Sequence, residues 1–150
     1  MSKTSPVPPG FRTVTPHLTV ADGKKALDFY QRAFGAEIVR KIAVPGGPIM
    51  HADLKIGDSM VMLQDEMEGQ KGPQGSTPVT IHLYVPNADA TFSNAVKAGA
   101  QPAMPLTDMP WGDRFGVVVD PFGHSWSIAT RVEEVSDAEL FKRLADAPAQ

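Results

Sequence analysis

Apolar and polar side chains alternate in two short stretches of nearly the same sequence, TPHLTV at residues 15–20 and TIHLYV at residues 80–85. Alternation with a period of two is typical of a β-strand that packs one face on a core. In both stretches leucine and valine share one face, while threonine and histidine share the other. The stretches begin 80 − 15 = 65 residues apart, so the pattern predicts an internal repeat.

Each of these stretches is followed by a segment with the apolar spacing of an amphipathic helix. The first segment begins after Asp22 and ends before Gly35, and the second begins after Asn87 and ends before Gly99. Asp and Asn are frequent N-cap residues, and glycine often follows a helix because it adopts a left-handed backbone readily. The sequence therefore predicts a helix after each first strand, with an apolar stripe that packs on a sheet.

Three further strands are predicted after each helix, separated by glycine and proline. Their predicted bounds are Glu37–Val44, Ile49–Ile56 and Ser59–Gln64 in the first half, and Gln101–Leu106, Arg114–Val119 and Ser125–Thr130 in the second. The chain thus contains the unit βαβββ twice, in an α+β fold. We predict one domain over residues 1–150, with a first module at 13–65, a linker at 66–77 and a second module at 79–131.

A short C-terminal helix is predicted at residues 136–146. Ser136 and Glu139 have the spacing of a capping box, in which the side chain of each residue accepts a hydrogen bond from the backbone N–H of the other. Leu140, Phe141 and Leu144 follow at helical spacing, so this helix has an apolar side that should pack on another surface.

Composition and charge narrow the class of protein. Fourteen basic and seventeen acidic residues give a net charge of −3, and there is no basic block, so neither nucleic acid nor an anionic membrane is expected as a partner. The absence of cysteine excludes disulfides and thiolate zinc sites. No apolar run approaches the roughly 18 residues that a membrane span needs, and the first residues lack the apolar segment of a signal peptide. We expect a cytoplasmic protein whose partner is a small organic molecule.

The polar faces of the two repeated strands are expected to line a hollow, because their apolar faces suit the helices. On the last strand of each half, alternation separates Met60 and Met62, or Trp126 and Ile128, from the residues between them. We assign those intervening residues to the hollow as well. The expected lining is Thr15, His17, Val61, Leu63, His82, Tyr84 and Ser127.

Four histidines are candidates for chemistry. His17 and His82 hold equivalent positions in the repeat, and they could bind a ligand or a metal, act as acid and base, or form hydrogen bonds without chemistry. His51 and His124 lie beside turns or strand starts, where we expect structural hydrogen bonds.

A loop with the sequence WGDR offers Trp111 and Arg114 as rim residues. An indole and a guanidinium together would hold an anionic or planar ligand. The alternative is a hairpin whose tryptophan covers the core.

Three segments, in order along the chain, resemble a known superfamily. They are HLTVADGKKALDFYQRAFGAE (17–37), MHADLKIGDSMVMLQDE (50–66) and WGDRFGVVVDPFGHSWSIATRVEEVS (111–136). On these segments the chain is similar to the vicinal oxygen chelate superfamily, which holds glyoxalase I, the bleomycin- and fosfomycin-resistance proteins and the extradiol dioxygenases, and in particular to its PhnB-like branch. The resemblance covers nearly the whole chain and implies that the two modules form a cupped, mixed β-sheet.

The same resemblance implies where a metal would bind. In metal-using relatives each module gives two ligands, typically a histidine on its first strand and a glutamate on its last. Carried over to this sequence, the four positions are Thr15, Val61, Thr80 and Ser127. None offers an imidazole or a carboxylate, so we expect no metal cofactor.

Two hypotheses about function follow. The first is a binding protein for a small organic molecule, held in the cup without a cofactor. The alternative is a metal-dependent lyase or dioxygenase that uses His17 and His82. The resemblance also implies a homodimer, because such relatives commonly build their cups across two chains.

Overall fold

Each half of the chain folds into a four-stranded sheet with a helix on one face, in a computed structural model that describes residues 4–148. Module one contains β1 (His17–Val20), α1 (Gly23–Phe34), β2 (Glu37–Ala43), β3 (Ile49–Ile56) and β4 (Ser59–Asp65). Module two contains β5 (Thr80–Tyr84), α2 (Ala88–Ala98), β6 (Gln101–Asp108), β7 (Asp113–Val119) and β8 (Ser125–Arg131). The helix α3 (Asp137–Asp146) follows module two.

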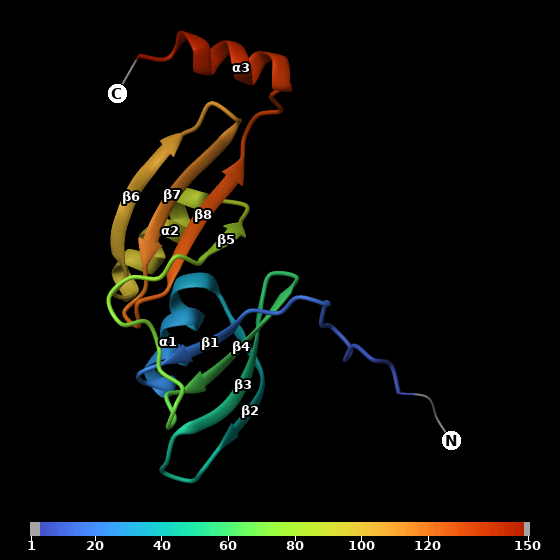
Figure 1. Cartoon of the computed structure of the whole chain (residues 1–150), viewed down its shortest axis with the longest axis vertical. Helices are drawn as coiled ribbons and strands as arrows, with labels where there is room; N and C mark the ends of the chain where they lie inside the picture. Colours follow the sequence, from blue (N-terminus) through green and yellow to red (C-terminus); the bar gives the residue numbers. More distant parts are fainter. Residues whose placement is uncertain (1–3, 149–150) are drawn as a thin grey trace.

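The two sheets have the same topology, with strand orders β1-β4-β3-β2 and β5-β8-β7-β6. In each sheet the first pairing is parallel and the other two are antiparallel. The predicted α+β class is therefore confirmed. The two modules lie end to end, with α3 beyond module two and the N-terminal segment projecting to one side (Figure 1). Their strands form two separate sheets within residues 4–148, not one continuous hydrogen-bonded sheet.

The strand register confirms that the repeat is structural. His17 lies opposite Met62 on β4, and His82 lies opposite Ser127 on β8. The separations 82 − 17 and 127 − 62 are both 65, so the same pairing occurs in each module. The first strand is shorter than predicted, because Thr15 and Pro16 precede β1, although the carbonyl of Pro16 still accepts a hydrogen bond from Met62 N at 2.8 Å.

Side-chain caps fix the predicted helices. The Asp22 side chain accepts a hydrogen bond from Lys25 N, and α1 ends at Gly35 with φ 66°. The Asn87 side chain does the same for Ala90 N at the start of α2. Ser136 caps α3 by accepting from Glu139 N. All three helices therefore begin where the sequence predicted.

An aromatic cluster joins the modules. Trp126 of β8 is fully buried, and its ring lies 4.8 Å from Phe34 and 5.4 Å from Tyr30, both on α1 (centroid distances). The buried carboxylate of Asp120 accepts hydrogen bonds from the Tyr30 hydroxyl and from Trp126 Nε1. Burial, together with this carboxylate, raises the pKa of Tyr30 well above its usual value. The contact between modules is thus both apolar and hydrogen-bonded.

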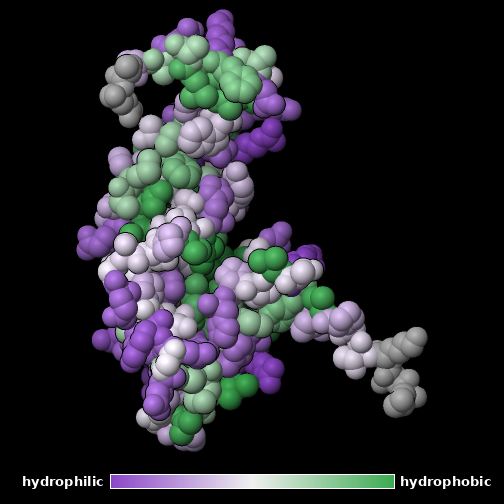
Figure 2. Space-filling model, in the orientation of Figure 1, coloured by the Kyte–Doolittle hydropathy of each residue, from purple (hydrophilic) through white to green (hydrophobic). Residues whose placement is uncertain are grey.

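The helix α3 is attached to module two through Arg143. Its guanidinium donates to the Pro110 carbonyl and pairs with the carboxylates of Glu133 and Glu139. The apolar residues Phe141 and Leu144 stay exposed, and Figure 2 shows hydrophobic side chains gathered on the surface at this end of the molecule. Among residues 4–148, no helix has the length and apolar character that crossing a membrane requires.

Candidate functional site

Within residues 4–148, each sheet has one face under a helix and an opposite face that no helix covers, which we call the open face. On module one the cross-strand neighbours His17, Met62 and Asp53 share the open face. On module two the equivalent row is His82, Ser127 and Val117. The prediction that the polar side of the repeated strands looks away from the helices is therefore confirmed.

The prediction that Val61 and Leu63 face away from the helices is wrong, although Val61 still borders a hollow between the modules with Thr15 and His82. Leu63 lies opposite Leu18 and is completely buried in the core beneath α1, and Val61 belongs to the same core. The open face of β4 instead carries Met62. The prediction gave Val61 and Ser127 corresponding positions, but the loop before β4 has two residues (57–58) and the loop before β8 has five (120–124). A slip of one residue moves every side chain of a strand to the other face.

Aromatic rings cover the open face of module two. His82 Nδ1 and Ser127 Oγ share a hydrogen bond at 2.6 Å. The His82 ring lies 4.5 Å from the ring of Tyr84 and is stacked on Phe115 at 6.0 Å (centroid distances). The Tyr84 side chain extends into solvent, with 68% of the residue exposed. This face can therefore accept a flat ligand against its rings.

The buried carboxylate of Asp113 holds two aromatic side chains of this face in position. Asp113 Oδ2 accepts hydrogen bonds from Trp111 Nε1 at 3.1 Å and from the Tyr84 hydroxyl at 3.4 Å. The Trp111 ring packs edge-on against Phe115 at 5.9 Å and remains 44% exposed. The structure thus adds Asp113 and Phe115 to the predicted residues of this face. Asp113 and Phe115 are two residues apart on β7, which puts both side chains on one face of the sheet. This spacing is the sequence signal that could have identified them.

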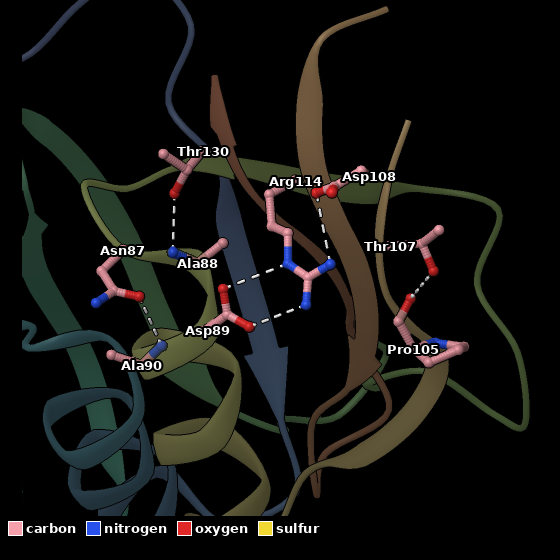
Figure 3. A network of polar contacts seen from close by, with 9 residues as sticks. All are labelled: Asn87, Ala88, Asp89, Ala90, Pro105, Thr107, Asp108, Arg114 and Thr130. Carbon is pink, nitrogen blue, oxygen red and sulfur yellow. Dashed lines mark hydrogen bonds and ion pairs between the residues drawn. The ribbon is translucent and has the colours of Figure 1, made fainter. Parts of the chain in front are cut away.

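Arg114 does not lie on this face, contrary to the predicted role as a rim residue. Its guanidinium pairs with Asp89 at the start of α2 and with Asp108 on β6, at 3.1 and 3.5 Å (Figure 3). The hydrogen bond from Arg114 lowers the pKa of the Asp89 carboxyl. Because Arg114 follows Asp113 on a strand, it points to the helix side while Asp113 points to the open side. Its positive charge is therefore already paired with two carboxylates.

His17 and His82 line different hollows, so the structure does not bring them together as a pair. His82 shares a hollow of about 180 Å³ between the modules with Thr15, Val61 and other residues. His17 lines a more open hollow of about 310 Å³ with Lys71 and His124. The alternative hypothesis, an enzyme that uses His17 with His82, gains no geometric support.

His17 instead meets His51. Their ring centroids are 5.7 Å apart with the rings nearly perpendicular, and His51 Nε2 lies 2.7 Å from Asp53 Oδ1. His51 forms the predicted hydrogen bond, but its partner, Asp53, is not among the predicted residues. His51 and Asp53 are two residues apart on β3, which puts both side chains on one face. This spacing is the sequence signal for the pair. The predicted structural bond of His124 is present, from its Nε2 to the Thr19 carbonyl at 2.8 Å.

The donor set at the superfamily's metal positions does not fit a divalent metal. The strand register replaces Val61 by Met62 as the counterpart of Ser127. The four positions then offer three hydroxyls, from Thr15, Thr80 and Ser127, and one thioether. Zinc, nickel and manganese prefer imidazole, carboxylate or thiolate. No group of three or more His, Asp or Glu side chains within residues 4–148 is arranged to hold a metal ion.

Comparison with known families gives a match over most of the chain. A family model described as "Glyoxalase/Bleomycin resistance protein/Dioxygenase superfamily" matches residues 12–128. The uncharacterized protein Rv0887c of Mycobacterium tuberculosis (strain ATCC 25618 / H37Rv) is 44% identical over 134 residues, covering 85% of this chain and 79% of the relative. Protein YjdN of Escherichia coli (strain K12) is 28% identical over 137 residues, covering 77% of this chain and 92% of that protein.

Solved structures share the fold. TioX from Micromonospora sp. ML1 superimposes with a TM-score of 0.66 at 30% identity, covering 81% of this chain and 99% of TioX. FosX, a genomically encoded fosfomycin resistance protein from Listeria monocytogenes solved with Mn(II) and sulfate, has a TM-score of 0.62 at 16% identity, covering 89% and 97%. A PhnB protein from Bacillus cereus has a TM-score of 0.62 at 20% identity, covering 79% and 99%. At these identities, FosX and the PhnB protein show likeness of fold alone.

Proposed function

The chain belongs to the Glyoxalase/Bleomycin resistance protein/Dioxygenase superfamily, and we propose on this basis that it binds a small organic molecule on the open face of module two. One observation carries the proposal: His82, Tyr84, Phe115 and Trp111 form a continuous row of rings that no helix of the described part of the chain covers. Rings presented in this way suit a ligand with a planar aromatic group, which gains from stacking and from removing apolar surface from water.

The ligand binds without a metal in this proposal, because the hydroxyl and thioether donors described above are poor ligands for divalent ions. The PhnB-like branch remains a proposal as well. It is supported by the three sequence segments that suggested it, while the solved PhnB protein adds only the shared fold.

Binding can be tested by titrating the protein with bleomycin and with acridine orange, a planar aromatic dye. We expect at least one of them to change the fluorescence of Trp111, because its ring lies at the site, whereas Trp126 is fully buried in the core. Trp111→Ala or Phe115→Ala should weaken binding by about 10-fold, the effect of removing one stacked ring. Isothermal titration calorimetry measures the loss without relying on Trp111. Native mass spectrometry of protein purified without chelator will report any ligand or metal retained from the cell.

Val96→Ala is the matched control, because Val96 is an exposed apolar residue on α2, on the helix side of the sheet. It should bind the dye as the wild type does. Equal affinities for Trp111→Ala, Phe115→Ala and the wild type would contradict the proposed site, as would a metal ion retained at one equivalent.

We also propose that the protein is a homodimer. Two features support a second copy as the partner: open sheet faces on both modules, and the exposed residues Phe141 and Leu144 of α3. The ion pairs of Arg143 hold α3 to module two with this apolar side turned to solvent. Apolar side chains held in a fixed position on the surface are typical of an interface.

The double variant Phe141→Ser, Leu144→Ser should raise the dimer dissociation constant at least about 100-fold, because burial of each side chain contributes about 1.5 kcal/mol or more, and the two together about 3 kcal/mol. Sedimentation equilibrium at micromolar concentration measures the constant. Lys142→Ser, on the same helix, is the control and should leave the constant unchanged. A wild type that sediments only as a monomer would exclude the dimer.

A further inference from the structure

Module one carries a cluster of titratable side chains that the proposed binding function does not use. His17 on β1, and His51 and Asp53 on β3, all belong to its open face. The carboxylate of Asp53 contacts His51 at 2.7 Å, and the ring of His17 lies 5.7 Å from that of His51. All three residues belong to module one, so the cluster lies outside the proposed binding face of module two.

Within residues 4–148, Asp53 differs from Asp120, Asp65 and Asp113, whose carboxylates each hold other groups of the structure in place. Asp120 accepts four hydrogen bonds that hold a loop and join the modules. Asp65 accepts from the backbone N–H groups of Gly23 and Ile49, and Asp113 positions two aromatic side chains. Within residues 4–148, Asp53 accepts a hydrogen bond from His51 alone. Burial of a carboxylate is costly, so a carboxylate retained for one imidazole indicates a role for that imidazole.

The contact fixes the hydrogen-bonding role of one nitrogen of His51. A carboxylate only accepts hydrogen bonds, so Nε2 of His51 donates to Asp53 and Nδ1 is the nitrogen that faces away from the carboxylate. An imidazole held by a buried carboxylate in one tautomer is the arrangement that enzymes use for proton transfer. His17 supplies a second imidazole close enough to act on the same small molecule.

The adjoining hollow suits an anionic group. His17 borders this space of about 310 Å³ together with Lys71, Ser76, Thr77 and His124. The Lys71 ammonium lies 3.7 Å from Glu66, at the long end of ion-pair distances, and is largely exposed. A lysine charge with two hydroxyls is a suitable set of donors for a carboxylate or a phosphate.

We propose that the open face of module one is a proton-transfer site for a small carbonyl compound that carries an anionic group. Nδ1 of His51 removes a proton from the carbon next to the carbonyl. The electron pair of that C–H bond forms a C=C bond, and the carbonyl oxygen takes the released π pair together with a proton that the His17 ring donates. The product is the enol, and the reverse steps return a proton to carbon, so no other reactant is needed. Asp53 is a positioning residue that acts through His51.

Deuterium exchange tests this step directly. The protein is incubated in D₂O with 2-oxobutanoate, which carries a carboxylate, or with dihydroxyacetone phosphate, and loss of the proton signal next to the carbonyl is followed by NMR. We expect catalysed exchange with at least one of these compounds and little with uncharged butanone. The pair of probes distinguishes a carboxylate site from a phosphate site. His51→Asn should reduce exchange to the rate in buffer, and His17→Asn and Asp53→Asn should each slow it at least about 10-fold.

Two measurements separate this role from a structural one. Asp53→Asn keeps the shape of the side chain, so its melting temperature should match the wild type while exchange slows, and the ¹⁵N spectrum of His51 should report the Nε2–H tautomer in the wild type. Asp28→Asn, the same change at an exposed position on α1, should leave exchange unchanged. The proposal fails if neither anionic compound exchanges, if exchange survives His51→Asn, or if butanone exchanges as fast.

Discussion

Replacing Asp120 by alanine is expected to lower the free energy of unfolding by about 3–5 kcal/mol, the largest effect of any single substitution considered for this protein. The carboxylate accepts hydrogen bonds from the Tyr30 hydroxyl, Trp126 Nε1 and the backbone N–H groups of Phe122 and His124. Alanine removes all four acceptor contacts and leaves the buried hydroxyl and indole N–H without a partner. Since a domain is stable by only about 5–15 kcal/mol, urea unfolding at low temperature is the suitable measurement.

Tyr30→Phe provides the control for this result, because it removes one donor and keeps the aromatic packing with Phe34 and Trp126. The expected loss is about 1–2 kcal/mol, well below that of Asp120→Ala. If Asp120→Ala and Tyr30→Phe cost the same, the carboxylate does not organise the loop at 120–124, and the contact between modules depends on the rings alone.

Gly112→Ala is expected to destabilise the protein by about 2–4 kcal/mol and to weaken ligand binding at Trp111. Gly112 has φ 102°, which side-chain-bearing residues rarely adopt, and a Cβ there would overlap the carbonyl oxygen of Glu133. Its own carbonyl accepts hydrogen bonds from Val132 N and Glu133 N. The loop that carries Trp111 would therefore have to move, and thermal unfolding together with dye titration will report both effects.

Gly46→Ala is the matched control. Gly46 also has a positive φ, of 70°, but an added Cβ there meets no atom within 4 Å. Only the backbone cost of about 1 kcal/mol is expected, with ligand binding unchanged. Equal losses for the two variants would mean that the close approach of Gly112 to Glu133 has no role in holding the Trp111 loop.

A comparison of β4 with β8 shows that the sequence alone does not predict which face of β4 is the open face. Both strands have an alternating pattern, and both follow a glycine turn, so the sequence predicts that Val61 is the counterpart of Ser127. The structure matches Met62 to Ser127, because the two turns differ in length. Alternation gives the two faces of a strand but does not say which face is covered, and β4 carries apolar side chains on both.

The sequence by itself determined the repeat, the α+β class and the starts of all three helices. These features depend on local rules: the period of the apolar residues and the capping by Asp22, Asn87 and Ser136. Only the tertiary structure decided which side chains meet. Arg114 pairs with Asp89 twenty-five residues away, and His17 meets His51, because strand register and helix position bring them together. Such contacts depend on the lengths of turns and on which partners are nearest in space, and neither is encoded in the periodicity of a single segment.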